Sequence, residues 1–176
     1  GTMLQAAEPC GRNKIPVMGI NLGKIGFMTE VETDDMTSAC DKLLAGDFKV
    51  ENRMMMEICV GENKFIALND AVLGKEDAQM IGAEIYASGD KISEYIADGL
   101  IISTPTGSTG YSLSAGGPVS DPALDLFIAT PICAHTLSAR PMLLSPSKDI
   151  TVKLNDKGKN SAVLTVDGEI KCTISE

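Results

Sequence analysis

The pattern of hydrophobic and polar residues changes character near Phe48. Before that point the chain is typical of alternating helices and strands. Residues 2–8 are compatible with the first turns of a helix, and the short apolar run from Ile15 to Ile20 predicts a buried strand. A second helix is predicted from Thr33, whose side chain can cap it, to Gly46, which can end it. Four apolar residues of this second helix share one face: Met36, Cys40, Leu43 and Leu44.

After Phe48, short runs rich in Val, Ile and Tyr alternate with turn residues such as Gly89-Asp90. Short strands at such regular spacing are typical of an antiparallel sandwich or barrel, and we expect about nine of them before Ile174. The stretch from Ser103 to Pro118 has no periodic pattern, and we expect a loop without regular structure of its own. The expected fold class is therefore α+β, dominated by an antiparallel β-sandwich.

The formal net charge of −9 argues against nucleic acid or an anionic membrane as a partner, because both are bound through basic patches. An anionic small ligand would have to be held by backbone N–H groups, helix N-termini or a metal. No apolar run approaches the roughly 20 residues that span a bilayer. The chain also shows no charged-then-apolar leader. We therefore expect a soluble, cytoplasmic protein.

The five cysteines are an odd number without any Cys-x-x-Cys pair. In a chain of this length they predict neither a disulfide framework nor a zinc site. Small, buried, apolar side chains in a reducing compartment are favoured over a redox role.

The residues from Asp98 to Pro118 read DGLIISTPTGSTGYSLSAGGP. A strand, Leu100 to Ile102, runs into a segment dense in Gly, Ser and Thr. Hydroxyls and accessible amides at this spacing suit a polar ligand with many acceptors, such as a ribose, an adenine edge or a phosphate. The alternative is a flexible linker, but Tyr111 and the prolines are unusual in linkers. On composition alone, a binding loop is favoured over a linker.

This pattern resembles the hallmark of the NAD kinases, DG-x4-TPTGST-x-YSLSAGGP, with Gly110 at the variable position. Other matches to that family follow in the right order along nearly the whole chain. They are NLGKIGFMTE (Asn21–Glu30), Asn69-Asp70 within FIALNDAVL, PICAHTLSARP (Pro131–Pro141) and Val166-Asp167-Gly168.

The resemblance implies a division of the chain into three parts. Residues 1–47 are expected to be a remnant of an N-terminal α/β, Rossmann-like, nucleotide-binding domain. Residues 48–150 are expected to form an all-β NAD-binding domain, and residues 151–176 a closing β segment that returns towards the N-terminal domain.

The resemblance also implies an activity. NAD kinases transfer a phosphoryl group from ATP or polyphosphate to the adenosine 2′-hydroxyl of NAD, which makes NADP, and such chemistry needs Mg²⁺ or another divalent metal. Gly1-Thr2 looks like the end of the family's Gly-Gly-Asp-Gly-Thr loop, whose Asp accepts the hydroxyl proton. We therefore expect the catalytic Asp upstream of Gly1, no catalytic residue and no metal ligand within these 176 residues, and no useful activity of this stretch alone.

The family's NAD-binding positions carry over residue by residue. They are Gly1, Leu4, Phe27, Asn69, Asp70, Asp98, Thr106, Thr109, Gly110, Tyr111, His135 and Asp167. The resemblance places Asn69 and Asp70 on ribose hydroxyls and Asp98 on the nicotinamide carboxamide. The four residues from Thr106 to Tyr111 would surround the adenine end, Leu4 and Phe27 would be apolar walls, and Gly1 would offer its amide near phosphate.

A simpler interpretation is also open for the pair Asn69-Asp70, for Asp167 and for His135. Asn69-Asp70 outside its context reads as a β-turn, and Asp167 reads equally well as a turn residue before Gly168 or as a residue facing the phosphates or the nicotinamide ribose. His135 reads as a structural histidine or, by resemblance, as a neighbour of the nicotinamide end of NAD bound in another subunit. A catalytic role for His135 is the least favoured.

By resemblance the partners are NAD, ATP or polyphosphate, and further copies of the chain in a homodimer or homotetramer. Two other function classes stay open. One is a lipid kinase of the diacylglycerol kinase type, which shares the Gly-Gly-Asp-Gly-Thr loop but lacks TPTGST-x-Y. The other is a non-catalytic NAD-binding or regulatory module.

Overall fold

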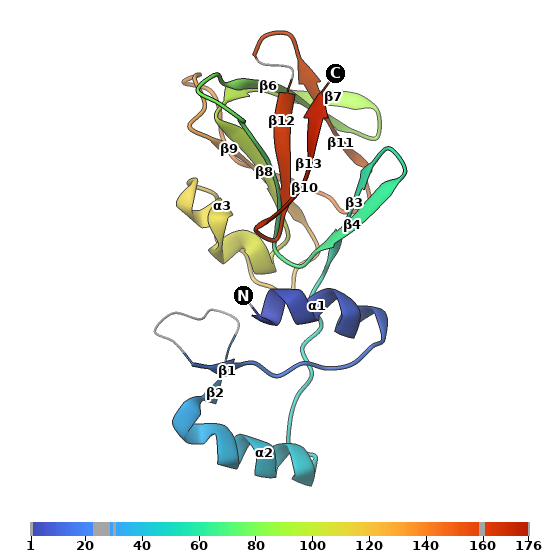
Figure 1. Cartoon of the computed structure of the whole chain (residues 1–176), viewed down its shortest axis with the longest axis vertical. Coiled ribbons are helices and arrows are strands. Elements are labelled where there is room, and N and C mark those ends of the chain that lie inside the picture. Colours follow the sequence, from blue (N-terminus) through green and yellow to red (C-terminus); the bar gives the residue numbers. More distant parts are fainter. Residues whose placement is uncertain (1, 23–28, 30, 159–160, 176) are drawn as a thin grey trace. The chain divides into compact units, whose positions relative to one another are not determined.

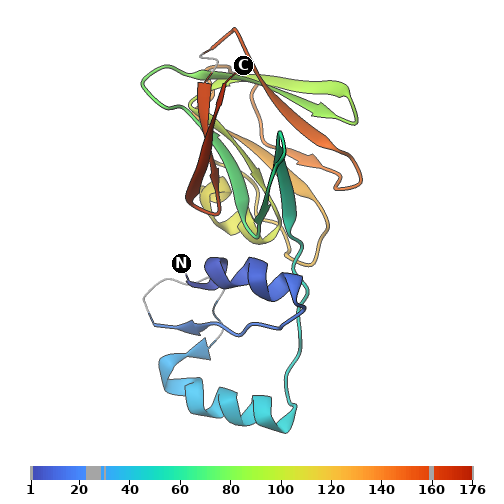
Figure 2. The same ribbon diagram turned by 45° about the vertical axis from the view of Figure 1, so that its right-hand side comes forward.

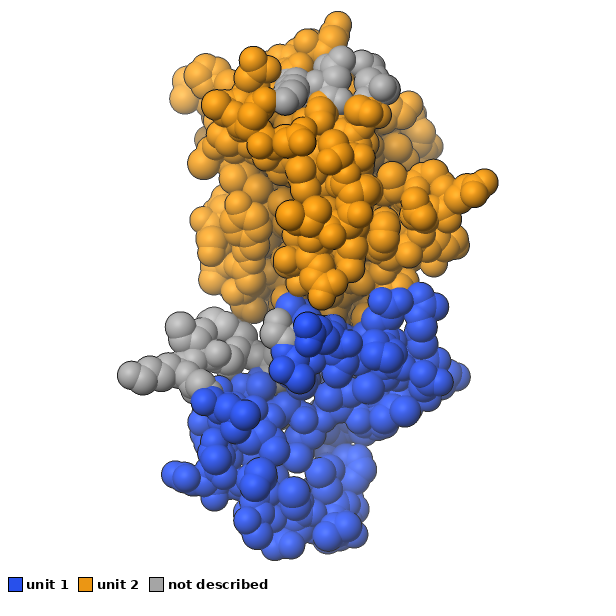
Figure 3. Space-filling model, viewed as in Figure 1, with its two compact units in different colours: residues 1–52 blue, residues 53–176 orange. Residues whose placement is uncertain are grey.

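The computed structural model describes residues 2–22, 29, 31–158 and 161–175. The chain divides into two compact units, residues 1–52 and residues 53–176, which Figure 3 draws in blue and orange. Within the described residues, no helix combines the length and the apolar character needed to cross a membrane.

The first unit contains α1 (Thr2–Arg12), η1 (Thr33–Asp35) and α2 (Met36–Ala45). It also contains two strands of two residues each, β1 (Ile20–Asn21) and β2 (Val31–Glu32), which pair in parallel. The predicted second helix is confirmed, although its first turn is the 3₁₀ turn η1. It ends at Gly46, whose φ of 74° is the left-handed conformation that glycine adopts without strain.

The strand predicted for residues 15–20 is wrong. Only Ile20 is paired, and Ile15, Val17 and Met18 are exposed. Pro16 explains part of the failure, because proline lacks the N–H that a strand would donate to its neighbour. The apolar run is genuine, but it is not buried within its own unit.

The second unit is built almost entirely of antiparallel strands (Figures 1 and 2), as the expected fold class requires. Eleven strands are described here, against the nine expected. They are β3 (Met56–Val60), β4 (Asn63–Ala67), β5 (Asp70–Gly74), β6 (Ile81–Ala87), β7 (Asp90–Ala97), β8 (Gly99–Ser103), β9 (Phe127–Ile132), β10 (Met142–Leu144), β11 (Ile150–Asn155), β12 (Ser161–Val166) and β13 (Glu169–Ser175).

A six-stranded sheet has the order β10-β9-β8-β5-β12-β13, a three-stranded sheet has the order β11-β6-β7, and β3 and β4 form a hairpin. The strands of residues 151–176 therefore pair inside the second unit, with β12 between β5 and β13. The domain limits at residues 47 and 150 stay predictions, because compact units and functional domains need not coincide.

The two larger sheets share one hydrophobic core. On β8, Leu100 and Ile102 lie in this core together with Ile85 of β6. Ile101 is equally buried but faces the other side of the sheet, since successive side chains of a strand alternate. The central strands are thus covered on both faces, which is why β5 and β8 are apolar almost throughout.

The second face of the six-stranded sheet is covered by the segment that follows β8. This segment was predicted to lack regular structure, and that prediction is wrong: it contains η2 (Thr106–Thr109) and α3 (Tyr111–Ser114). The Ser112 hydroxyl lies 2.9 Å from that of Thr130 on β9, and both residues are fully buried. A hydrogen bond between a hydroxyl of α3 and one of β9 therefore helps to fix the conformation of this Gly- and Ser-rich sequence.

The expectation of buried cysteines is also wrong. All five are free thiols, and none is buried. Cys40, Cys59 and Cys133 are exposed, and Cys10 and Cys172 are half-buried.

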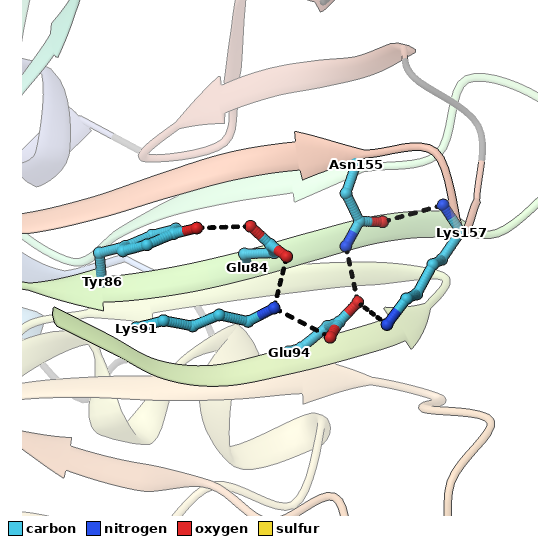
Figure 4. A network of polar contacts seen from close by, with 6 residues as sticks. All are labelled: Glu84, Tyr86, Lys91, Glu94, Asn155 and Lys157. Carbon is cyan, nitrogen blue, oxygen red and sulfur yellow. Dashed lines mark hydrogen bonds and ion pairs between the residues drawn. The ribbon is translucent and has the colours of Figure 1, made fainter.

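A network of polar side chains ties the three-stranded sheet together on the side away from the core (Figure 4). Lys91 of β7 contacts the carboxylates of both Glu84 and Glu94. Tyr86 donates a hydrogen bond of 2.7 Å to Glu84, and Asn155 of β11 donates one of 2.8 Å to Glu94. The hydrogen bonds from Lys91 and then Tyr86 lower the pKa of Glu84 to about 2.

We predict that Glu84→Gln lowers the melting temperature at pH 7 and that this difference shrinks in acid. The pKa of Glu84 is lower in the folded protein than its ordinary 4.5, so its stabilising effect is complete above that value and fades as the pH falls towards 2. Thermal unfolding between pH 3 and pH 8 measures the difference. Glu169→Gln is the control, because the Glu169 side chain is mostly exposed and ion pairs of exposed groups contribute little. A pH-independent difference would contradict the prediction.

Candidate functional site

The segment Leu68–Asp70 connects β4 to β5, and the carboxylate of Asp167 binds all three of its backbone N–H groups. The N–H groups of Leu68 and Asn69 each donate to it over 2.8 Å, and that of Asp70 over 3.1 Å. Asp167 lies just after β12, nearly a hundred residues further along the chain. The antiparallel pairing of β5 with β12 brings the two together.

The three carbonyl groups of the same segment are also bonded. Thr104, directly after β8, donates its hydroxyl to the Leu68 carbonyl and its backbone N–H to the Asn69 carbonyl, the latter over 2.8 Å. The Asp70 carbonyl accepts from the backbone N–H of Asp167 over 3.0 Å. Every backbone polar group of Leu68–Asp70 therefore has a partner. The side chains of Asn69 and Asp70 are left available for other contacts.

The polar ends of the Asn69 and Asp70 side chains both lie beside Gly110. A methyl group built on Gly110 would lie 3.8 Å from Nδ2 of Asn69 and 3.9 Å from Oδ2 of Asp70. Gly107 packs even more closely, since a methyl group there would lie 2.1 Å from the Asn69 carbonyl oxygen. The glycines of η2 and the residue after it therefore let the Gly-rich segment approach the Asn-Asp pair.

The site is electrostatically unusual because the Asp70 carboxyl group is buried. Burial, and secondarily the negative charge of Asp167, raise the pKa of Asp70 from 3.8 to about 6. No hydrogen bond to this carboxyl group is found among the described residues. At neutral pH it is still mainly ionised, so it can accept hydrogen bonds from a ligand's hydroxyl groups.

Further hydrogen-bonding capacity is unused around this point. Among the described residues, the buried side-chain oxygens of Asn69, Ser103 and Thr106 have no partner. Ser103 lies opposite Asp70 in the β5–β8 pairing, so the two side chains share a face of the sheet. Buried polar atoms normally have partners, and a cluster of unpartnered ones indicates a place where a ligand or water binds.

The hydroxyl residues of the Gly-rich segment divide into two groups. Ser108 and Ser112 are buried and bond within the fold, to Ser120 and Thr130 respectively. Thr109 and Gly110 are partly exposed and Tyr111 is half-exposed, so they face outward and remain accessible. The predicted ligand-binding positions belong mainly to this second group, with the buried Thr106 between the two.

Asp98 and His135 are not part of this cluster. Gly99, next to Asp98, pairs with Gly74 at the far end of the β5–β8 ladder, four residues and about 13 Å from the Asp70–Ser103 end. Asp98 forms a 2.7 Å ion pair with Lys75, and the exposed His135 donates its backbone N–H to Ile96. The structure thus brings the predicted residues together in two groups at opposite ends of the same strands.

The remaining predicted residues cannot be added to either group. Gly1 and Phe27 lie outside the described residues. Leu4 lies in α1 of the first unit. Sequence reasoning overlooked Thr104 and Gly107, although both lie inside the TPTGST motif, because their role is to hold the backbone of a segment more than 30 residues earlier.

Comparison with known proteins identifies the family of the chain. Residues 68–176 match the ATP-NAD kinase C-terminal domain, and residues 1–48 match the ATP-NAD kinase N-terminal domain. The chain belongs to the ATP-NAD kinase family. The first of these matches contains both halves of the Asn69–Asp70 site, the loop itself and Asp167.

Relatives of this chain include the NAD kinase of Geobacter sulfurreducens, which is 45% identical over 182 residues. That match covers 98% of this chain and 64% of the relative. The NAD kinase of Heliobacterium modesticaldum is 44% identical over an alignment of 176 positions, and the match covers 96% of this chain and 62% of the relative. The chain therefore spans slightly less than two thirds of the length of these curated relatives.

Two solved structures are similar to this chain in fold. Yeast NADH kinase complexed with NADH has a TM-score of 0.83 at 28% identity, covering 92% of this chain and 48% of that one. An NAD kinase from Archaeoglobus fulgidus in complex with ATP has a TM-score of 0.76 at 28% identity, covering 92% and 61% respectively.

Gly107→Ala should disturb the site. The added methyl group would meet the Asn69 carbonyl oxygen, and relieving such overpacking costs about 1–3 kcal/mol of folding free energy. Gly74→Ala is the matched control, because that position on the same sheet has nothing within 4 Å of the new methyl group. Thermal unfolding of both variants tests this expectation. Equal melting temperatures would show that the contact between Gly107 and Asn69 is not tight.

Proposed function

We propose that the protein containing this chain transfers the γ-phosphoryl group of ATP to the adenosine 2′-hydroxyl of NAD, which makes NADP. The observation that supports this most directly is the Asn69–Asp70 pair. Its backbone is fully bonded, while a buried carboxylate and an amide with an unpartnered oxygen converge beside Gly110. An amide and a carboxylate side by side can satisfy the two hydroxyls of a ribose.

The two groups of predicted residues suit the two ends of a dinucleotide. In this proposal Asn69 and Asp70 bind ribose hydroxyls, and the segment Thr106–Tyr111 surrounds the adenine. Asp98, about 13 Å away along the strands, serves the nicotinamide end of the same NAD. His135 would do so for NAD bound in a neighbouring copy. Gly1, Leu4 and Phe27 keep the roles that the family resemblance gives them.

Asp167 does not fit the role of a phosphate- or ribose-facing group in this arrangement. Its carboxylate already accepts three backbone hydrogen bonds. The proposal therefore assigns recognition of the ribose to Asn69 and Asp70 alone.

Removal of the proton from the 2′-hydroxyl is assigned to the aspartate of the Gly-Gly-Asp-Gly-Thr loop that Gly1-Thr2 resembles. Asp70 is the nearest carboxylate in the described site, but the proposal occupies it with ribose hydroxyls. General base catalysis of this kind typically accelerates a reaction about 100- to 10,000-fold.

A divalent metal, Mg²⁺ by expectation, belongs to the proposal through the phosphates of ATP. Within the described ranges, no three His, Cys, Asp or Glu side chains lie close enough together to hold a metal. The residues described do not form a protein site for Mg²⁺, so no residue of this chain is assigned to it and no step depends on it.

The proposal is tested by measuring NADP formation from NAD and ATP by the full-length protein, with polyphosphate as a second donor. Failure to form NADP with either donor would overturn it. We expect NADP with ATP. The donor comparison decides between ATP alone and both donors.

Asn69→Ala should weaken NAD binding by about 1–3 kcal/mol, the effect of losing one or two hydrogen bonds to the ribose. Calorimetric titration of NAD into the full-length protein measures the change. Asn63→Ala is the control, because Asn63 is an exposed residue of the β3–β4 hairpin. An unchanged dissociation constant for Asn69→Ala would reduce Asn69 to a turn residue.

We further propose that the working protein is a homodimer or homotetramer, with the segment Pro131–Pro141 at or near the contact between copies. Leu137, within this segment, is 97% exposed, and such a side chain gains by burial against a second copy. A cytoplasmic location and the lack of nucleic-acid and membrane partners remain predictions from the sequence.

Sedimentation at micromolar concentration should show an oligomer for the parent and a smaller species for Leu137→Glu. Leu124→Glu is a suitable control, since Leu124 is exposed but lies outside the segment. A monomeric parent that binds NAD with full affinity would remove the proposal.

A further inference from the structure

The side chain of Asp167 makes hydrogen bonds that its place in a turn does not require. Asp167 and Gly168 connect β12 to β13, and both have positive φ angles, 49° and 84°. Asp-Gly is a preferred sequence for such a two-residue hairpin turn, and so are Asn-Gly and Gly-Gly. The turn alone therefore explains the backbone of Asp167 but does not require its carboxylate.

The carboxylate has a separate task. Oδ1 accepts from the N–H groups of Asn69 and Asp70, and Oδ2 accepts from that of Leu68. Successive N–H groups that converge on one anion form a nest, and hydrogen bonds to an ionised acceptor are roughly twice as strong as neutral ones. One side chain thereby sets the direction of three consecutive peptide groups.

We propose that Asp167 is a positioning residue for NAD recognition, which orients the side chains of Asn69 and Asp70 towards Gly110 without contacting the substrate itself. This inference rests on the proposed function of the Asn69–Asp70 pair. It differs from the reading of Asp167 as a ligand of the phosphates or the nicotinamide ribose, because here both of its oxygens already accept hydrogen bonds from the backbone.

The position of Asp167 also has an electrostatic consequence for Asp70. Two carboxylates close together repel each other, and the charge of Asp167 is the second contribution to the raised pKa of Asp70 after burial. The backbone N–H groups compensate Asp167 but not Asp70. The arrangement thus keeps one carboxylate satisfied and leaves the other in need of a donor, which a ribose hydroxyl can supply.

The turn chemistry offers a clean set of variants. Asp167→Asn and Asp167→Gly both retain residues that this hairpin turn accepts, whereas an alanine would add strain at the positive φ. Asparagine keeps one acceptor oxygen and glycine keeps none. Asp90→Asn is the matched control, an exposed aspartate beside the Ser88-Gly89 hairpin turn.

The first measurement is hydrogen exchange of the Leu68, Asn69 and Asp70 amides in the full-length protein, followed by NMR. We expect these amides to be protected in the parent and in Asp90→Asn, and to exchange faster in both Asp167 variants, most in Asp167→Gly. Unchanged protection in Asp167→Gly would overturn the inference. This measurement does not depend on activity.

The second measurement is NAD affinity by calorimetry together with KM for both substrates. We expect Asp167→Asn to weaken NAD binding about tenfold to a hundredfold, as for one or two lost hydrogen bonds, with KM for ATP within about twofold of the parent. A merely structural role would raise KM for both substrates together, and that outcome would overturn the inference.

A double-mutant cycle with Asn69→Ala separates positioning from direct contact. If Asp167 acts through Asn69 and Asp70, the double variant should bind NAD no more than a few-fold more weakly than the weaker single variant. Effects that multiply in full would show that Asp167 contacts NAD independently, and the inference would fail.

The parent protein distinguishes the two proposals. A parent that makes no NADP overturns the proposed function. The amide exchange of Leu68–Asp70 then decides by itself whether Asp167 orders this segment.

Discussion

The described site depends on one constraint: β5 lies between β8 and β12, and both neighbours end beside the first residues of β5. Thr104 follows β8 and Asp167 follows β12, so the residues that precede β5 are bonded from both sides. A short connection that would otherwise be a mobile turn becomes part of the sheet. Everything inferred about ligand recognition follows from this rigidity, because side chains that are already fixed lose less conformational entropy when a small molecule binds.

The same arrangement carries a cost in stability. The Asp70 carboxyl group is buried beside a second carboxylate, and several side-chain oxygens around it have no partner in the described part of the chain. Each buried polar group left unpaired costs on the order of 1–3 kcal/mol. The apolar strands β5 and β8, buried on both faces, offset this cost. A ligand that supplies the missing hydrogen bonds would remove this cost.

The fold was largely predictable because its signals are local. Gly46 ends a helix through its own backbone conformation. Leu100–Ile102 are a continuous apolar run, and such a run is typical of a strand that is buried on both faces. The Gly- and Ser-rich segment after β8 was harder. Its helices are held by contacts such as Ser112 with Thr130, which no window of adjacent residues reveals. The strand predicted from Ile15 to Ile20 was wrong for a different reason. An apolar sequence does not specify which part of a protein covers it, and Ile15 is exposed.

The Asn69–Asp70 pair was predictable as a site from its motif, but the reason for its geometry was not. Asp167 is linked to Leu68 across 99 residues of sequence, and an Asp-Gly dipeptide gives no hint of a distant partner. Thr104 and Gly107 lie in a motif that was interpreted as a ligand-binding loop, so their contacts with the backbone of Leu68 and Asn69 were not predicted. Motifs of this kind therefore mix two functions, contact with a small molecule and support of another part of the backbone.

The place of β12 in the six-stranded sheet has a consequence for how the protein is made. β5 and β8 are synthesised long before β12, so β5 leaves the ribosomal exit tunnel with one of its two edges unpaired. About 60 further residues must be synthesised, at roughly 5–20 residues per second, before that edge can be closed. During those seconds β5 is an apolar edge strand open to pairing with another chain. Nascent chains of this protein are therefore candidates for chaperone binding at β5.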